Sequence, residues 1–223
     1  MSTEDPQRPE AAPHYLAALD LRGRRCVVAG GGAVARRKVE GLLAAGAEVL
    51  VVAPVVGEMP AGVAVERRAA RPTDLDGAAL AVCATDDPAV NASLAAEARR
   101  RGVWANVVDD PGAGDFTVPS TLRRGALRIG VSTGGASPAL ARRLREGLEP
   151  LFGTEHGELV ELLAELRAAW EPRALAAGVP PAARRAAWHA VLELPLLELL
   201  RSGRGGEART AALAALEAAL AEG

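Results

Sequence analysis

The first half of the chain alternates between short apolar runs and segments with helical spacing. Residues 25–29 form an apolar, β-branched run that ends at a glycine triplet. Residues 34–45 then have helical spacing up to Gly46, a residue typical of helix C-termini, and residues 47–53 form a second apolar run. Strand, glycine turn, helix and strand within about 30 residues predict a βαβ unit with a right-handed crossover.

The same alternation continues beyond this unit. Further strands are expected at residues 63–67, 79–84 and 103–108, with a helix at residues 87–101. Strands that alternate with helices favour a mostly parallel sheet, and the continuous apolar run at residues 49–52 is typical of a strand buried on both faces. We therefore expect an α/β fold with a Rossmann-type, doubly wound parallel sheet.

The pattern changes after Asp109. Residues 116–119 and 126–132 are predicted to be strands on either side of an exposed turn at residues 123–125, and neither is followed by a crossover helix. From Pro138 onward the spacing is helical. Helices are expected at residues 139–151, 155–170, 182–192, 196–200 and 207–222.

This pattern divides the chain into four regions. Residues 1–13 are polar and contain prolines but no apolar core of a signal peptide, so we expect a disordered lead-in. Residues 14–112 are expected to form the Rossmann domain, residues 113–150 a small β-containing middle segment, and residues 151–223 a helical C-terminal domain.

Composition indicates a soluble globular protein. The chain of 223 residues is 49% hydrophobic and 24% charged with a formal net charge of -2, and it lacks the basic surplus of most nucleic-acid binders. No apolar run reaches the roughly 18 residues of a membrane span. Cys26 and Cys83 lie inside apolar runs and are expected to be buried thiols in a reducing cytosol, so the predicted location is cytoplasmic.

The glycine turn after the first strand is the clearest candidate for a binding site. Gly30-x-Gly32-x-x-Ala35 has the G-x-G-x-x-A form, in which glycines permit a tight turn and close approach of a pyrophosphate to a helix N-terminus. This context favours cofactor binding over a purely structural turn. The cofactor-binding residues expected here are Gly30, Gly32, Ala33, Val34 and Ala35.

The residues alone leave NAD and NADP open. A carboxylate about 20 positions after the turn would normally bind the adenosine ribose, but the second strand ends at Val52-Ala53-Pro54. Arg67 and Arg68 could favour a 2′-phosphate, although a solvated basic pair is the preferred interpretation.

Two further strand ends carry polar residues. Ligands of doubly wound sheets bind at the carboxyl ends of the strands, so Thr85 and Asp86 are candidate neighbours of the cofactor. Asp86 or Asp87 could instead cap the next helix, and both roles can coexist. Asp109, at the end of the fifth strand, could be the general base for a proton lost beside a hydride; a turn-forming role is an equal alternative.

Residues 132–138, Ser-Thr-Gly-Gly-Ala-Ser-Pro, lead from a strand into a helix. Ser137 is expected at the N-cap and Pro138 at the first helical position. Glycines and hydroxyls before a helix N-terminus can bind anions, and three arginines (Arg142, Arg143 and Arg145) follow. A capped helix with a solvated basic face is the alternative. The three histidines have no metal-ligand spacing, so no bound metal is expected.

Together these motifs resemble the sirohaem synthase dehydrogenase/ferrochelatase family, also called precorrin-2 dehydrogenase. The matching blocks are residues 30–38, 84–91, 106–109, 116–120 and 132–138. Five blocks in the same order are far more specific than one glycine turn, and the resemblance extends from about Tyr15 to Leu166.

The resemblance implies NAD-dependent oxidation of precorrin-2 to sirohydrochlorin in sirohaem biosynthesis. Some members also insert Fe²⁺ or Co²⁺ into the product, and members are homodimers that associate through the segment matching residues 113–150. It implies catalysis by Asp109 and NAD binding by Pro54, Val55, Thr85 and Asp86. Precorrin-2 carries eight carboxylates, which suits the arginine-bearing helix. The substrate-binding residues expected on this basis are Asn106, Ser120, Ser132, Thr133, Gly134, Gly135, Ser137 and Arg142.

The chain departs from the family's pattern in two respects. Some members carry a phosphorylated serine at the position of Thr133, so phosphorylation is left open here. Some continue into a methyltransferase domain, whereas this sequence ends at Gly223, and a stand-alone form is expected. The alternative function from another class is an NAD(H)-binding redox-sensing module without catalysis. Chelatase activity, its metal and the role of the helices after Arg167 are not predicted.

Overall fold

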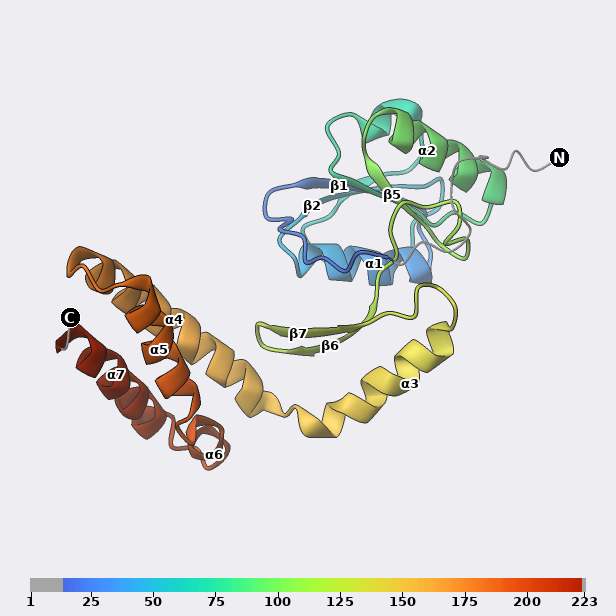
Figure 1. Ribbon diagram of the computed structural model, residues 1–223. Coiled ribbons are helices and arrows are strands. Elements are labelled where there is room, and N and C mark those ends of the chain that lie inside the picture. The colour runs from blue at the N-terminus through green and yellow to red at the C-terminus, as the bar shows by residue number, and fades with distance from the viewer. Residues whose placement is uncertain (1–13, 222–223) are drawn as a thin grey trace. The chain divides into compact units, whose positions relative to one another are not determined.

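The structure is a computed structural model that describes residues 14–221 (Figure 1). The predicted lead-in at residues 1–13 lies outside the described residues. The chain divides after Val118 into two compact units, and each is described by itself.

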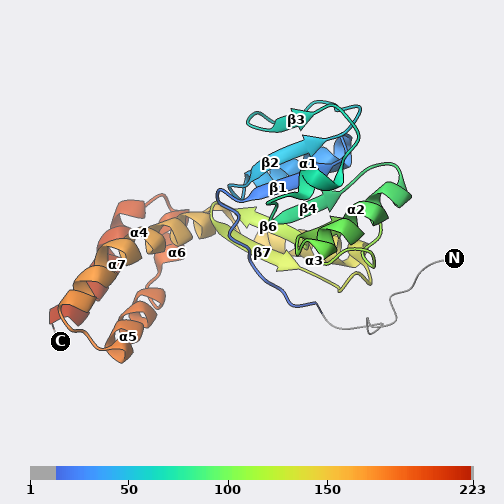
Figure 2. The same ribbon diagram turned by 90° about the horizontal axis from the view of Figure 1, so that it is seen from above.

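The first unit is built on a five-stranded sheet in which every pairing is parallel. Its strands, in spatial order, are β3 (Ala64–Glu66), β2 (Glu48–Val52), β1 (Arg25–Ala29), β4 (Leu80–Cys83) and β5 (Trp104–Val107). Figure 2 shows β3, β2, β1 and β4 side by side in this order. This order confirms the predicted Rossmann-type fold.

Helices cover both faces of this sheet. Neighbouring residues of a strand point to opposite faces and therefore pack against different helices. On β1, Cys26 and Val28 pack in a cluster with α1 (Ala33–Leu43), whereas Val27 and Ala29 pack with α2 (Pro88–Arg100) and the short helix η1 (Pro72–Leu75). Cys26 and Cys83 belong to different clusters and are both buried and free, as predicted.

The predicted strand at residues 116–119 is wrong. This stretch is a loop that covers the outer edge of β5. The Asp115 N–H donates to the Ala105 carbonyl at 2.7 Å, and the Asp115 carboxylate accepts the Ala105 N–H at 3.1 Å. Phe116 packs on the α1 side of the sheet. The run is therefore apolar because one side chain is partly buried, and not because it pairs as a strand.

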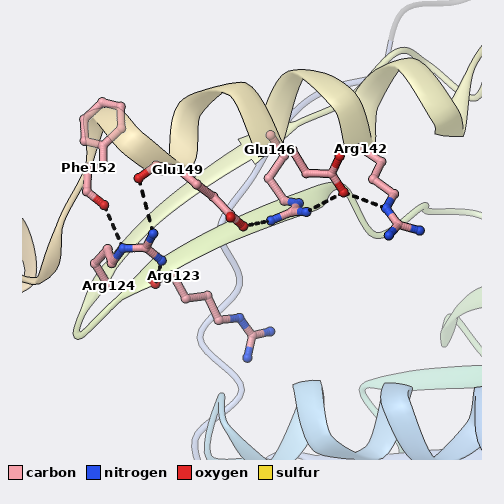
Figure 3. A network of polar contacts seen from close by, with 7 residues as sticks. Arg123, Arg124, Arg142, Glu146, Glu149 and Phe152 are labelled. Carbon is pink, nitrogen blue, oxygen red and sulfur yellow. Dashed lines mark hydrogen bonds and ion pairs between the residues drawn. The ribbon is translucent and has the colours of Figure 1, made fainter.

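The second unit begins with an antiparallel hairpin of β6 (Ser120–Arg124) and β7 (Leu127–Val131). The predicted exposed turn at residues 123–125 is only partly right: Gly125 lies in the exposed turn, whereas Arg123 and Arg124 pair with the opposite strand as the last residues of β6. Arg124 donates through Nε to the Phe152 carbonyl at 2.7 Å (Figure 3). It thereby satisfies a carbonyl just after α3 (Pro138–Leu148) and η2 (Glu149–Leu151), which explains why an arginine ends this strand.

The remaining helices pack around a core of their own. They are α4 (Thr154–Ala176), α5 (Pro181–Leu192), α6 (Leu196–Arg201) and α7 (Gly205–Ala221). Trp170 of α4 is fully buried in this core, and its indole N–H donates to the Leu216 carbonyl of α7 at 2.9 Å. Within residues 14–221, none of the helices combines the length and apolar character needed to cross a membrane.

Candidate active site

The carboxyl ends of β1 and β4 meet at the point where the strand order reverses. Gly30 follows β1 with φ +130°, and a Cβ on this residue would lie 2.2 Å from the Ala84 carbonyl oxygen after β4. Only glycine avoids both the left-handed backbone strain and this overlap. The first glycine of the motif therefore brings two strand ends together at the place where doubly wound sheets bind ligands.

Gly31 has an equally close neighbour. A Cβ there would lie 2.1 Å from the Val55 carbonyl oxygen, and the Gly57 N–H donates to the Gly31 carbonyl at 3.0 Å. The Pro54–Val55 segment is thereby held against the glycine turn. The Val55 side chain is 82% exposed and so forms an apolar surface beside this turn.

Gly32 differs from both, because a Cβ on it would meet no described atom within 4 Å. This residue is the N-cap of α1, where no side chain of the described residues caps the helix and the Arg36 N–H donates to the Gly32 carbonyl. Open space thus lies beside Gly32, at the end of the helix where the N–H groups of Ala33, Val34 and Ala35 have no intrahelical acceptor. The arrangement fits a cofactor pyrophosphate at a helix N-terminus.

Thr85 is fixed by a residue absent from the predicted site. Its hydroxyl donates to Oδ1 of Asn91 at 2.7 Å, and Nδ2 of Asn91 donates back to the Thr85 carbonyl at 2.9 Å. Asn91 is 5% exposed on α2. Asp87 caps α2 by accepting the Ala89 N–H at 2.8 Å, whereas Asp86 is exposed. Asn91 therefore sets the shape of the strand end, and Asp87 performs the predicted capping.

Asp109 lies just after β5 and is exposed. Its φ of 65° makes it the only residue other than glycine with positive φ within residues 14–221. Aspartate tolerates this region better than most residues, and such conformations cluster at functional sites. No described group donates a hydrogen bond to its carboxylate. The neighbouring Asp110 accepts the Ala113 N–H at 3.2 Å, so the turn-forming role falls to Asp110.

Lys38 of α1 provides a positive charge near Asp109. Partial burial lowers the pKa of Lys38, and the positive charge of Arg37 acts in the same direction, while the negative charge of Asp109 opposes the shift. Val108, which precedes Asp109, packs in the same cluster as Ala35 and Val39 of α1. A lysine that loses water on burial gains from a nearby carboxylate.

Asn106 is buried instead of facing an open crevice. It is 5% exposed, and its Nδ2 donates to the Phe116 carbonyl at 3.0 Å. Its Oδ1 is buried and has no partner among the described residues. Asn106 therefore holds the loop after Asp109 through its Nδ2, while its buried Oδ1 remains an unsatisfied acceptor.

Of the two arginines after β3, Arg67 is exposed, as expected of a solvated pair, whereas Arg68 is not. Arg68 binds the carboxylate of Asp74 with both Nη atoms, at 2.8 and 2.6 Å, and Asp74 is 6% exposed. The guanidinium of Arg68 holds the pKa of Asp74 below its usual range. Arg67 donates to the Val56 carbonyl at 3.0 Å. Arg68 therefore has a structural role and is already paired.

In the second unit, the predicted substrate residues gather at one end of the hairpin. Ser120 pairs with Val131, so Ser120 lies beside Ser132 and the loop that leads into α3. The loop hydroxyls bond mainly to the loop itself. Ser132 accepts the Gly134 N–H at 3.2 Å, and the Thr133 hydroxyl donates to the Ser137 carbonyl at 3.1 Å.

Ser137 is the N-cap of α3, as predicted, and accepts the Leu140 N–H at 3.2 Å. Gly134 and Gly135 are exposed with φ of 63° and 89°, so the loop needs glycine at both positions. The groups that the loop presents to a ligand are consequently the backbone groups of Gly134 and Gly135, because its hydroxyls are engaged within the loop.

The arginines of α3 are partly engaged by glutamates, as Figure 3 shows. Arg142 donates to Glu146 at 2.8 Å while its side chain stays 76% exposed. Arg145 is 20% exposed and pairs with Glu146 and Glu149. Arg143 is exposed and forms no ion pair with a described residue. The face therefore offers Arg142 and Arg143 to an anion.

Comparison with known proteins places these features in one family. A family model described as NAD(P)-binding matches residues 17–120, and one described as "Sirohaem biosynthesis protein central" matches residues 124–150. The solved structure of SirC, precorrin-2 dehydrogenase, has a TM-score of 0.59 and 32% identity, covering 70% of this chain and 79% of that chain. The chain belongs to the precorrin-2 dehydrogenase family.

Sequence relatives agree with this family. The chain is 42% identical over 207 residues to a siroheme synthase of Methylococcus capsulatus, and 41% identical over 198 residues to one of Chromobacterium violaceum. These matches cover 90% and 86% of this chain but only 43% and 41% of the relatives. The chain thus spans less than half the length of these siroheme synthases.

The site residues predicted for this chain lie in two places in the structure. Those at the carboxyl ends of the first unit's strands are Gly30, Gly32, Ala33, Val34, Ala35, Pro54, Val55, Thr85, Asp86, Asn106 and Asp109. Those at one end of the hairpin are Ser120, Ser132, Thr133, Gly134, Gly135 and Ser137, with Arg142 one turn into α3.

Three residues of the candidate site, Gly31, Lys38 and Asn91, lie in the blocks that match the family, but sequence reasoning gave them no role. Gly31 occupied an unassigned position of the glycine motif. A signal for Asn91 was present, because it shares a helix face with Leu94, Ala95 and Ala98 at positions i, i+3, i+4 and i+7. A polar residue on an otherwise apolar face needs an internal partner.

Proposed function

We propose that this chain oxidises precorrin-2 to sirohydrochlorin with NAD as the hydride acceptor and Asp109 as the general base. The observation that carries the proposal is the state of Asp109. It is an exposed carboxylate without a described hydrogen-bond donor, held with positive φ at the carboxyl edge of the sheet that also holds the glycine turn.

The chemistry needs one base for each oxidation. The substrate loses two electrons and two protons, of which a hydride goes to NAD and the remaining proton must go to a base. The Asp109 carboxylate would accept that proton and release it to water through its exposed side. Lys38 would balance the negative charge that Asp109 carries before the transfer.

The glycine turn would bind the cofactor through its backbone. The open space at Gly32 supports a pyrophosphate against the first turn of α1, and the exposed Val55 supports an apolar contact with a cofactor ring. NAD is favoured over NADP, because Arg68 already binds the buried Asp74 and would have to leave it to reach a 2′-phosphate.

The end of the hairpin would bind the substrate's carboxylates. Gly134 and Gly135 would present backbone N–H groups, and Arg142 and Arg143 would supply positive charge. Arg142 would exchange its exposed pair with Glu146 for a substrate carboxylate, at little cost because exposed pairs contribute little. Ser120, Ser132, Thr133 and Ser137 would shape the loop.

The direct test is turnover. The protein mixed anaerobically with precorrin-2 and NAD should give the visible spectrum of sirohydrochlorin and one NADH, followed at 340 nm, per substrate oxidised. Formation of neither with NAD or NADP would contradict the proposal. Tight NADH binding together with no response to tetrapyrroles would favour the redox-sensing alternative.

Metal insertion is a second candidate activity of the same site. Inserting Fe²⁺ or Co²⁺ into sirohydrochlorin displaces two pyrrole protons, and the unpaired Asp109 carboxylate supports a role in accepting them. The macrocycle supplies its own nitrogen ligands, and no cluster of three His, Cys, Asp or Glu side chains suited to a metal is found within residues 14–221. Anaerobic insertion rates with and without protein, and with Asp109→Asn, would decide this activity.

A homodimer is the assembly we propose. The hairpin strands β6 and β7 pair only with each other within residues 14–221, so each has an outer edge available. An unpaired strand edge can pair with a strand of another chain, which supports association through this segment. Light scattering coupled to size-exclusion chromatography should give twice the chain mass, and a monomer mass would contradict it.

A further inference from the structure

A groove on the helical part of the second unit has no role in the proposed reaction. It has a volume of about 300 Å³ and lies along α4 and α5. Its lining residues are Arg167 and Glu171 of α4, with Pro181, Arg184, Arg185, Trp188, His189 and Leu192 of α5. Three arginines and one glutamate give this lining an excess of positive charge.

The floor of the groove is a fixed polar network. Glu171 accepts the Trp188 indole N–H at 2.9 Å and an Arg184 Nη1–H at 2.9 Å. These two donors, that of Trp188 first, lower the pKa of Glu171 and keep it a carboxylate. Glu171 therefore hydrogen-bonds one of the three guanidinium groups, that of Arg184, while the charge of Arg167 also helps to lower the pKa of the Glu171 carboxylate.

The other two guanidinium groups are left for a ligand. Arg167 is exposed and stacks over the Trp188 ring, 4.7 Å from its centre, and Arg185 is exposed beside Arg184. Neither forms an ion pair with a described residue. The Nε of Arg184 is also buried without an acceptor among residues 14–221. One unsatisfied donor and two guanidinium groups without an ion pair to a described residue therefore line one small space.

The groove also has an apolar side. Trp188 is half-buried and packs edge to face on the buried Trp170, with ring centres 5.9 Å apart. Leu192, one turn further along α5, is 57% exposed. A rigid indole next to an exposed leucine suits a flat apolar body, whereas guanidinium groups suit carboxylates.

We propose that this groove binds a small aromatic carboxylate, with its carboxylates on Arg167 and Arg185 and its ring against Trp188 and Leu192. The volume matches the lower end of small-molecule sites and is too small to enclose a tetrapyrrole. The site is independent of the dehydrogenase reaction and would be occupied without NAD or precorrin-2.

The test is calorimetric titration with benzene-1,3,5-tricarboxylate at constant ionic strength. The wild-type chain should bind one equivalent, and Arg185→Gln should weaken binding by about tenfold through the loss of a charged hydrogen bond. The double variant Arg167→Gln/Arg185→Gln should show no heat of binding. Arg204→Gln, which removes an exposed arginine outside the groove, should bind like wild type.

Three results would overturn the proposal. They are no binding to the wild-type chain, equal binding to the double variant, and equally tight binding of inorganic phosphate, which lacks the apolar ring. NADH titration of every variant should be unchanged, so failure of the groove can be separated from failure of the proposed dehydrogenase site.

Discussion

Alanine substitutions at Gly30 and Gly32 should impair different properties of the protein, although both glycines belong to one motif. At Gly30 a Cβ would overlap the Ala84 carbonyl oxygen, and the backbone has φ +130°. At Gly32 a Cβ would enter open space, and φ is −87°, a value that alanine adopts readily. Gly30→Ala should damage the fold, whereas Gly32→Ala should damage cofactor binding.

The size of each effect follows from the geometry. At Gly30, forcing alanine into this backbone region costs about 1–3 kcal/mol, and moving the Ala84 carbonyl costs about 1–3 kcal/mol more. At Gly32, the change at the N-cap costs the fold about 0.5–1 kcal/mol. Its Cβ would keep a phosphate from the N–H groups of α1, and losing one charged hydrogen bond there costs about 1.5–3 kcal/mol of binding, or about 10–100-fold in Kd.

The assay combines NAD titration by calorimetry with urea unfolding followed by far-UV circular dichroism. In a Trp104→Phe background, tryptophan fluorescence would report separately on the second unit, which holds Trp170 and Trp188. Gly32→Ala should unfold near the wild-type midpoint and bind NAD weakly. If Gly32→Ala bound NAD as tightly as wild type, or if Gly30→Ala were as stable as wild type, the assignment of the two glycines would be refuted.

Three further predictions concern other contacts in the first unit. Arg68→Met should lower the free energy of unfolding by about 2–4 kcal/mol at pH 7, because it leaves the Asp74 carboxylate buried and unpaired. Because Arg68 holds the folded pKa of Asp74 below its unfolded value, the stability that this ion pair contributes is present above the unfolded pKa and is lost as the pH falls through the folded pKa. Urea titrations from pH 7 to 2 should show this loss in the wild-type protein and not in Arg68→Met. Burial raises the pKa of Cys83 to about 11, so at pH 8 its thiol should react with Ellman's reagent about 100-fold more slowly in the native protein than in urea. Asn91→Ala should weaken NAD binding about tenfold, because Thr85 loses its three hydrogen bonds to the Asn91 amide. Unchanged affinity would mean that Asn91 contributes to stability and not to NAD binding.

The parallel sheet could be predicted because its strands, apart from the exposed edge strand β3, are largely buried on both faces. Continuous apolar runs such as Val49–Val52, each bounded by a turn residue, leave little choice of element. The antiparallel segment was harder. At residues 116–119 a partly buried Phe116 imitates a strand, and the two arginines that end β6 resemble an exposed turn until Arg124 is seen to bond the carbonyl after η2.

Within the site, residue type predicted position better than it predicted partners. Gly30 and Asp109 could be selected because strand ends meet at one edge of a parallel sheet. The pairing of Arg68 with Asp74, and of Thr85 with Asn91, depends on side chains that meet only after folding. Spacing along the chain carries no direct record of those contacts.

The measurement that tests the central claim most directly is single-turnover oxidation of precorrin-2 by Asp109→Asn, with NAD affinity measured on the same sample. Removing the carboxylate removes the base, so the rate should fall by about 10²–10⁴-fold while NAD binds as in the wild-type protein. Asp110→Asn is the matched control, because Asp110 is engaged with the Ala113 N–H, and it should stay within about threefold of the wild-type rate. Oxidation by Asp109→Asn at the wild-type rate would contradict the assignment of Asp109 as the catalytic base.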